Sequence, residues 1–319
     1  MSLYNMREID LYNDEIKRRF IEERLQENVF SERFLLLQFD YVAEYEREHN
    51  KDVCNFSLYE IMEYLKMRGF VSLESANVTA SILNSYTTWC LQNSLVHDGQ
   101  NHFEELSQDL LMNTLNKAVL DLRLIDRETF VKYVNEIVNP RDQFVLMMLF
   151  ETGKSKDFEH IFSAQFKNFN AGTNELKLYD GRIVKVSNEL AHIIDDSYDA
   201  DIYYSISGNN AKKTTLITID DRIMKSYPNQ TSDVSVFQQG RVVYNSCVRS
   251  LRYLGLDFMN ANAVVEAGKI AYITEQAKTK GVSGIKLLQD REFVNKLEYQ
   301  FNFNLNKRMF IRKYNDYLA

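Results

Sequence analysis

The residues that could act on a phosphodiester lie in two stretches of the chain. Lys154-Ser155-Lys156 follow Thr152-Gly153, and Tyr314 lies close to the C-terminus. A hydroxyl oxygen can attack phosphorus when cationic groups stabilise the transition state and an acid protonates the leaving oxygen. No imidazole can help in the C-terminal region, because none of the five histidines lies in the last 127 residues. They are His49, His97, His102, His160 and His192.

No metal or cofactor site is expected. The three cysteines, Cys54, Cys90 and Cys247, are far apart and form no CxxC, and no histidine has ligand spacing. Gly281-Val282-Ser283-Gly284 is too short for a phosphate-binding loop and lacks its lysine. The widely spaced cysteines favour a reduced, cytoplasmic protein, and neither a signal peptide nor a membrane span is expected.

The charge of the chain is distributed unevenly. The net charge is −7, but residues 241–319 carry 13 basic and 7 acidic residues. Nucleic-acid binding depends on a local basic surface rather than on the total charge. The C-terminal third therefore fits a nucleic-acid partner, although a solvated helical face would have a similar composition.

Helical patterns dominate the N-terminal part of the chain, and proline is rare. Residues 6–27 predict an amphipathic helix, whose apolar face needs either the rest of the protein or another subunit. Four helices should follow in a small bundle. They are expected from Ser31 to about 48, from a capping box at Ser57 to Gly69, over 74–93 and over 103–116, with a linker at 117–126.

The second half predicts more helices around one β-hairpin. Residues 141–150 are strongly apolar, which indicates a buried helix that stops at Thr152-Gly153. Asp180-Gly181 between two alternating runs, 175–179 and 182–186, predicts a hairpin with a two-residue loop. Two short strands are expected at 203–206 and 216–219, around a turn at 208–210. Further helices are expected at 126–138, 157–162, 187–196, 219–226, 235–254, 261–279, 291–301 and 305–318.

This order of elements resembles the tyrosine recombinases, the phage integrase family. The best match is Asn139 to Ile161, and Gln165 to Val186 resembles the family's three-stranded sheet. The resemblance implies a mainly α fold with a small β-sheet, in which a helical core-binding bundle precedes a catalytic-type domain. We expect an amphipathic helix at 1–27, a SAM-like core-binding domain at 28–117 and the recombinase-like domain at 118–319.

The family's active-site positions are degenerate in this chain. Ser155 stands where the resemblance places the first catalytic arginine, and the stretch ending at Val265 replaces the His-x-x-Arg box. Lys177 or Lys185 falls near the family's lysine. Tyr314 is the best candidate for the nucleophile, followed by Tyr317 and Tyr299, but a packing tyrosine on a terminal helix explains the position better. A lysine beside Ser155 cannot supply the bidentate fork of an arginine. We therefore expect no catalysis and a retained ability to bind DNA.

Candidate DNA contacts are spread over both predicted domains. For each of them an ordinary solvated side chain is the alternative. On the bundle they are Ser81, Asn84, Ser85 and Thr88; in the C-terminal domain they are Lys154, Lys156, Lys177, Arg182, Lys185, Lys212, Lys213, Arg241, Arg249, Arg252, Lys269 and Lys278.

The resemblance implies sequence-specific binding to double-stranded DNA operators without strand cleavage. A phage or prophage repressor that controls lysogeny fits best, acting at the nucleoid and partnered by a second copy or an anti-repressor protein. One alternative is an active recombinase with a displaced pocket. The other is a helical protein–protein adaptor that recruits its partner through the acidic N-terminal helix.

Overall fold

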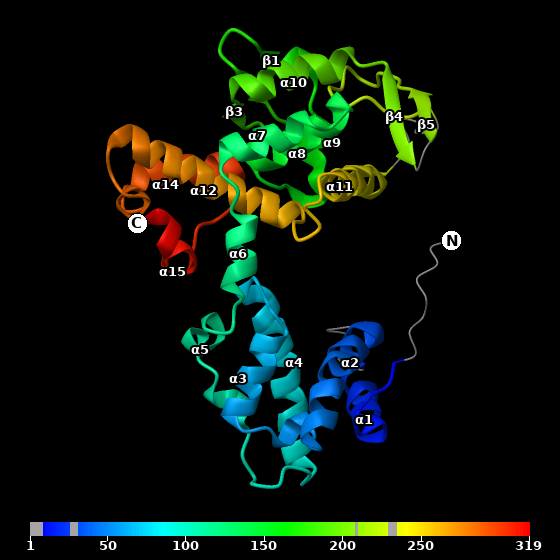
Figure 1. The fold of residues 1–319 in the computed structure, drawn as a ribbon, viewed down its shortest axis with the longest axis vertical. Helices are drawn as coiled ribbons and strands as arrows, with labels where there is room; N and C mark the ends of the chain where they lie inside the picture. The colour runs from blue at the N-terminus through cyan, green and yellow to red at the C-terminus, as the bar shows by residue number, and fades with distance from the viewer. Residues whose placement is uncertain (1–8, 26–30, 208–209, 229–234) are drawn as a thin grey trace. The chain divides into compact units, whose positions relative to one another are not determined.

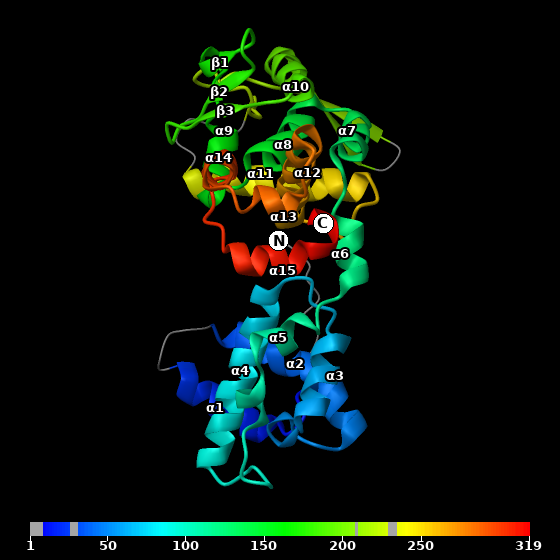
Figure 2. The same cartoon turned by 90° about the vertical axis from the view of Figure 1, so that its left-hand side faces the viewer.

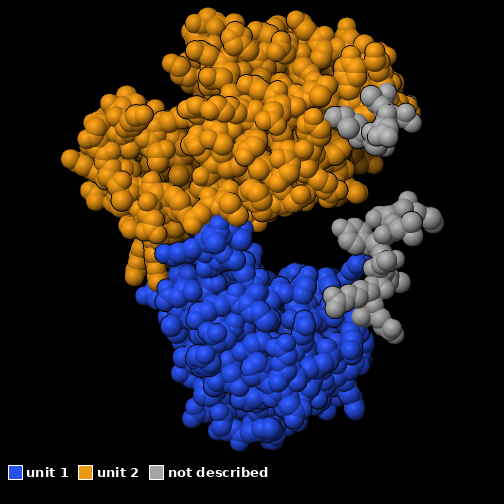
Figure 3. All heavy atoms as spheres, in the orientation of Figure 1, with its two compact units in different colours: residues 1–120 blue, residues 121–319 orange. Residues whose placement is uncertain are grey.

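The computed structural model describes residues 9–25, 31–207, 210–228 and 235–319. The ends of the predicted N-terminal helix and most of the predicted 208–210 turn lie outside these residues. The chain divides into two units, residues 1–120 and residues 121–319, coloured separately in Figure 3. Among the described residues no helix is both long and apolar enough to span a bilayer.

Unit 1 is a helical bundle with a short C-terminal extension (Figure 1). Its elements are α1 (Asp14–Leu25), α2 (Glu32–His49), η1 (Val53–Asn55), α3 (Leu58–Met67), α4 (Leu73–Gln92), η2 (His102–Glu105), α5 (Gln108–Met112) and the start of α6 (Lys117–Arg123).

The N-terminal helix α1 packs on this bundle. The Phe20 ring centroid lies 5.9 Å from that of Phe39 on α2 and 5.3 Å from that of Tyr86 on α4, both in edge-to-face geometry. Lys17 of α1 is fully buried and ion-paired with Glu46 of α2 at 2.6 Å. The sequence left open whether the apolar face of α1 packs on the rest of the protein or on another subunit. In the structure it packs on the rest of the protein.

Two predictions for unit 1 are corrected by local capping. The expected helix over 103–116 is two short helices, because Leu106 is extended and Ser107 caps a new helix by accepting from the Leu110 amide. The expected linker at 117–126 is helical at its start, in α6. The capping box at Ser57 and Glu60 is confirmed.

Unit 2 surrounds one buried helix. Its elements are the end of α6, then α7 (Arg127–Asn135), α8 (Pro140–Thr152), η3 (Lys156–Phe158), α9 (Glu159–Phe162), η4 (Phe166–Asn168), β1 (Phe169–Asn170), β2 (Glu175–Lys177), β3 (Ile183–Lys185), α10 (Asn188–Asp199), β4 (Ile202–Ser207), β5 (Asn210–Thr215), α11 (Val236–Tyr253), α12 (Ala261–Lys280), α13 (Gly284–Leu287), α14 (Arg291–Phe301) and α15 (Lys307–Leu318).

Helix α8 forms the centre of the unit 2 core, as its apolar run predicts. Every residue of 144–150 is fully buried, and α8 packs against α7, α10, α11, α12 and α14 (Figures 1 and 2). Gly268 lets α12 approach closely, since a Cβ there would lie 1.8 Å from the carbonyl oxygen of Phe150. The core therefore depends on direct backbone contact between α8 and α12.

The small sheet confirms the predicted three strands, in the order β1-β2-β3. Its hairpin loop differs from the prediction. The Leu178 amide bonds to the Arg182 carbonyl, so Tyr179, Asp180 and Gly181 form a three-residue loop. Gly181 has a φ of +84°, the left-handed conformation that such loops place after a turn.

Two predictions near residue 220 are wrong. The segment 219–226 is not helical, because its backbone bonds to distant segments: the Asp221 carbonyl accepts from Phe166, and the Ile223 amide donates to Ala164. The strand expected at 216–219 lies earlier, as β5. Ile202 pairs with Thr215, so the two-stranded sheet uses a polar segment that period-two hydrophobicity does not reveal.

Candidate functional site

A buried neutral pair occupies the position where the resemblance places the first catalytic arginine. The Oγ of Ser155 lies 2.7 Å from Nδ1 of His160, and Nε2 of His160 lies 3.1 Å from the carbonyl oxygen of Gly153. Burial, aided by the charge of Arg182, lowers the pKa of His160 to about 3. Because the ring is then neutral, it donates from Nε2 and accepts from Ser155. This position carries no positive charge for a phosphate.

The loop that holds this pair is tightly constrained. Asp157 and Phe158 both have left-handed backbone conformations, with φ of 53° and 59°. Such conformations are costly for residues with a Cβ. Gly240 of α11 packs directly on the loop, since a Cβ there would lie 2.2 Å from the Asp157 carbonyl oxygen. The loop therefore anchors α11 to the end of α8.

The stretch that replaces the second box lies at the start of α12. Val265 is buried in the unit 2 core, while Asn262 is exposed. Nζ of the exposed Lys154 lies 3.2 Å from Oδ1 of Asn262 and 5.2 Å from the centre of the Phe158 ring. The structure therefore brings the first and second positions together, with one lysine as the cation between them.

Tyr314, at the nucleophile position, is buried in α15 with 2% of its surface exposed. Its ring centroid lies 4.8 Å from that of Phe310, and the backbone of α15 is non-helical at Tyr314. Next to it, Lys313 pairs with Glu266 of α12 at 2.9 Å. In this arrangement the phenol belongs to a packed helix and does not face solvent.

The hairpin separates its predicted basic contacts onto two faces. Lys177 and Lys185 are exposed on the same face of β2 and β3. Arg182 is buried, and its guanidinium donates to the carbonyls of Tyr299 and Gln300. Strict alternation already places Arg182 on the side of Val184 and Val186. Arg182 is therefore a structural residue that joins the hairpin to α14. Its guanidinium is used in that contact, so it is not one of the proposed DNA contacts.

Helix α11 carries a polar stripe, of which only the arginines were predicted from the sequence. Its 18 residues, VFQQGRVVYNSCVRSLRY, include no acid. Five exposed side chains recur every three or four residues and so lie on one side of the helix. We call them the α11 stripe: Gln238, Arg241, Asn245, Arg249 and Arg252. The two amides were missed, although the absence of acids from an amphipathic helix was a usable signal.

The remaining basic candidates of unit 2 are dispersed. Lys212 and Lys213 are exposed on β5, Lys156 is exposed beside Ser155, and Lys278 is exposed in the last turn of α12. Lys269 is partly buried with its Nζ 3.7 Å from the centre of the Phe303 ring, and burial lowers its pKa to about 8. By contrast, Arg241, Arg249 and Arg252 are gathered on one side of α11.

The polar face predicted on α4 is largely engaged within unit 1. Asn101 donates to Oδ1 of Asn84 at 2.7 Å and to the hydroxyl of Thr88 at 2.9 Å. Arg24 of α1 donates to the hydroxyl of Ser85 at 2.8 Å. Ser81 is exposed. For Asn84, Ser85 and Thr88 the structure therefore indicates a role in packing α1 and the 101–105 segment.

No cluster of three or more histidine, cysteine or acidic residues suited to a metal ion occurs in the described part of the chain. All three cysteines are free and buried. The exposed lysine, arginine and amide side chains described above can form hydrogen bonds and charge contacts.

Two family models match the chain: the MrpR N-terminal core-binding domain over residues 11–92 and the MrpR C-terminal catalytic domain over residues 124–318. A relative is the "SPbeta prophage-derived uncharacterized protein YopR" of Bacillus subtilis (strain 168). It is 23% identical over 283 residues, which cover 85% of this chain and 84% of that protein. A similar solved structure, that of XerA recombinase, has a TM-score of 0.35 at 12% identity and covers 96% of this chain and 99% of that one.

Proposed function

Since the chain belongs to the MrpR family of tyrosine-recombinase-like proteins, we propose that it is a sequence-specific double-stranded DNA-binding protein that does not cut DNA. We further propose that it acts in the cytoplasm as a transcriptional repressor of prophage genes and so controls lysogeny. A second copy or an anti-repressor protein is the expected protein partner.

The α11 stripe is the observation that carries this proposal. An α-helix fits the major groove of B-DNA, where arginine can bond both acceptors of guanine, and asparagine or glutamine can bond adenine in the same bidentate way. The stripe offers these residue types on one side of a helix without a competing carboxylate in the helix itself. Each good bidentate contact discriminates by about 1–3 kcal/mol.

The exposed lysines supply the contacts to the DNA backbone in this proposal. Lys177 and Lys185 share one face of the hairpin, and Lys212 and Lys213 lie next to each other on β5. Phosphate contacts position a protein on DNA and contribute most of the salt-sensitive affinity. They do not require the two catalytic arginines that cleavage needs.

The proposed lack of cleavage is supported by the groups at the former active-site positions. A neutral Ser155–His160 pair replaces an arginine, a buried valine ends the second box, and the tyrosine hydroxyl is buried. Removing one donor that stabilises transition-state charge typically costs about 10²–10³ in rate. A protein that binds an operator without nicking it can occlude a promoter, which is the action of a repressor.

Selection from random duplexes, followed by gel shifts over a salt series, tests the proposal. We expect one enriched sequence whose logarithmic affinity falls linearly with the logarithm of salt concentration. A shuffled duplex of the same composition is the control, and it should bind at least about 10³-fold more weakly. Equal affinity for both duplexes would rule out sequence-specific binding.

An active recombinase remains the second candidate function, and one contact favours it. Lys154 lies beside Asn262, so a cation does reach the gap between the first and second positions. For this candidate, Tyr314 would have to leave its buried place in α15 to reach a phosphate.

A further inference from the structure

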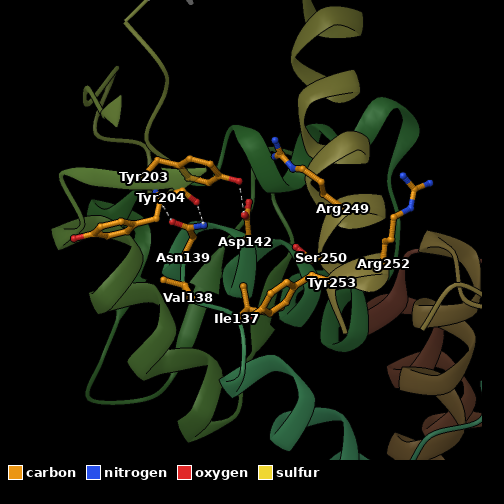
Figure 4. Close-up of a pocket in the computed structure, with 10 residues that line it drawn as sticks. All are labelled: Ile137, Val138, Asn139, Asp142, Tyr203, Tyr204, Arg249, Ser250, Arg252 and Tyr253. Carbon is orange, nitrogen blue, oxygen red and sulfur yellow. Dashed lines mark hydrogen bonds between the residues drawn. The ribbon is translucent and has the colours of Figure 1, made fainter. Parts of the chain in front are cut away.

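A cavity of about 240 Å³ lies beside the C-terminal half of α11. It is enclosed by α11, the start of α8 and strand β4 (Figure 4). In the close-up, Arg249 extends from α11 toward Tyr203 of β4, whereas Arg252 leaves the opposite side of the helix. The complete lining is Ile137, Val138, Asn139, Asp142, Tyr203, Tyr204, Arg249, Ser250, Arg252 and Tyr253.

Two buried polar side chains of the cavity are used to build its wall. The phenol of Tyr203 donates to Oδ2 of Asp142 at 2.8 Å, and the hydroxyl of Ser246 donates to Oδ1. The Asn139 amide group accepts from the Tyr204 backbone amide at 2.8 Å and donates to the Tyr204 carbonyl at 3.0 Å. These contacts hold β4 in place, so the wall is preformed before any ligand arrives.

The charge of the lining favours an anion. Two arginines and one carboxylate belong to the lining, and that carboxylate, Asp142, already lies 3.8 Å from the buried Arg141. Among the described residues, no carboxylate lies within ion-pair distance of Arg249, while Arg252 has only the exposed Asp257 at 3.8 Å. An anionic group beside Arg249 would form charge-assisted hydrogen bonds with it, and Arg252, whose side chain is 76% exposed, can join them by a change of rotamer.

The rest of the lining favours an apolar body of limited size. Ile137, Val138 and the ring of Tyr253 contribute hydrocarbon surface, and the cavity is smaller than the usual pocket for a drug-sized ligand. Such a combination, mostly apolar with a few placed polar groups, is the common composition of small-molecule sites. A single aromatic ring or a branched alkyl group fits the available space.

We propose that this cavity binds a small amphipathic anion, a carboxylate or phosphate monoester on a compact apolar body. The anion occupies Arg249 and Arg252, which are members of the α11 stripe. Ligand and DNA therefore compete for the same two guanidinium groups, and the ligand acts as an inducer that releases the operator. The competition rests on the proposed DNA-binding function, whereas the binding of the anion to the cavity does not.

Direct binding without DNA tests the cavity itself. Phenyl phosphate is the probe, inorganic phosphate carries the charge alone, and benzyl alcohol carries the ring alone. By NMR titration of the full chain at constant ionic strength, phenyl phosphate should bind at least about tenfold more tightly than either control. If phenyl phosphate bound no more tightly than inorganic phosphate, the proposal would be overturned. Such a result would show that surface charge alone binds the anion and that the apolar cavity contributes nothing.

Two variants localise the binding. Val138 is half exposed, so Val138→Trp can place a ring in the cavity without disturbing the core, and it should abolish phenyl phosphate binding. Arg252→Gln keeps the apolar walls and should weaken phenyl phosphate binding while leaving the weak binding of benzyl alcohol unchanged. Unaltered phenyl phosphate binding in both variants would place the probe elsewhere and overturn the proposal.

Competition with the selected operator tests the inducer role. It also distinguishes two sources of the anion in the cavity, a free ligand and a DNA phosphate. Phenyl phosphate should lower the operator affinity of the wild type beyond the effect of a salt-matched control. The Val138→Trp protein should bind the operator with wild-type affinity, and phenyl phosphate should not change that affinity. If Val138→Trp lost operator binding while folded, the cavity would hold a DNA group instead, and the inducer role would be overturned. If the wild type bound no DNA, the proposed DNA-binding function would be wrong. The direct titration with phenyl phosphate would still test whether the cavity binds an anion.

Discussion

The hydroxyl of Ser155 and the imidazole of His160 form a hydrogen bond of 2.7 Å in the interior of unit 2. The imidazole also reaches the Gly153 carbonyl, at the end of α8. One uncharged pair thus bonds to the polar groups of a strained loop at the place where the resemblance puts a phosphate-binding arginine. Protonation of His160 would put a buried charge beside Arg182, so the pair should be sensitive to acid.

We predict that His160 makes the stability of unit 2 depend on pH. Its pKa is about 3 in the folded state and about 6.5 in an unfolded chain, so the unfolded state binds more protons between these values. The free energy of unfolding contributed by His160 is therefore present above about pH 6.5 and is lost as the pH falls toward 3. The slope is at most about 1.4 kcal/mol per pH unit.

Urea unfolding at several pH values between 5 and 7 would measure this slope. His160→Gln should flatten it relative to the wild type, and His192→Gln, at an exposed position of α10, should not. The comparison between variants removes the contribution of Glu46, whose pKa is raised to about 7 by burial and which acts in the opposite direction. An equal slope in the wild type and His160→Gln would contradict the prediction.

We predict that Lys17→Met strongly destabilises unit 1. Lys17 is fully buried, pairs with Glu46 at 2.6 Å and lies 3.7 Å from Asp52, so its loss leaves buried carboxylates without a cation. Removing one partner of a buried ion pair typically costs about 3–5 kcal/mol. Denaturant unfolding followed by near-ultraviolet signals measures the loss.

Arg18→Ala is the matched control, one residue along the same helix. Its partner Asp14 is about half exposed, and an exposed pair contributes about 0–1 kcal/mol. Equal destabilisation by the two substitutions would show that Lys17 matters only through helix α1 itself and not through its charge.

We predict that the protein forms no covalent adduct with a nicked suicide duplex containing its selected site. The expected reason is that Ser155 and Val265 stand where the resemblance places the two catalytic arginines, together with the burial of Tyr314. Denaturing electrophoresis of the protein with labelled DNA provides the measurement, and an active recombinase on its own site serves as the positive control. An adduct that disappears in Tyr314→Phe would instead establish the second candidate function.

We predict that Arg241→Ala lowers the affinity for the selected operator by at least about tenfold while changing the affinity for a shuffled duplex much less. A base-reading arginine contributes about 1–3 kcal/mol of discrimination, and Arg241 is an exposed member of the α11 stripe. Fluorescence anisotropy with both duplexes would separate the two effects.

Lys132→Ala removes an equally exposed cation on α7, where it pairs with Glu128, and should change neither affinity. Equal loss on both duplexes in Arg241→Ala would identify a phosphate contact rather than base reading.

The core of unit 2 could be predicted because its signal is local. Seven consecutive apolar residues at 144–150 leave a helix no solvent-exposed side, and Thr152-Gly153 ends it. The turn chemistry of Asp180-Gly181 predicted a hairpin for the same reason. The length of its loop was missed, because Gly181 serves a three-residue loop as well as a two-residue one.

The segment around 220 could not be predicted from local pattern. Asp220 and Asp221 have left-handed backbones. The Asp221 carbonyl accepts from the Phe166 amide and the Ile223 amide donates to the Ala164 carbonyl, and each bond joins residues more than fifty positions apart. Helix periodicity in a short polar stretch is a weak signal, and it cannot reveal hydrogen bonds to distant segments, which form only in the packed fold.

The sequence by itself determined that the C-terminal region has no histidine, that α11 has no acid, and that a serine follows Gly153 by two residues. These are facts of composition and order, and without any coordinates they predict that the recombinase pocket is incomplete. Tertiary structure alone decided which polar side chains remain available. It buried Arg182 against α14, engaged Asn84, Ser85 and Thr88 within the bundle, and placed Arg249 and Arg252 over a cavity. The physical reason is that availability depends on neighbours brought from distant parts of the chain, whereas residue type and spacing do not.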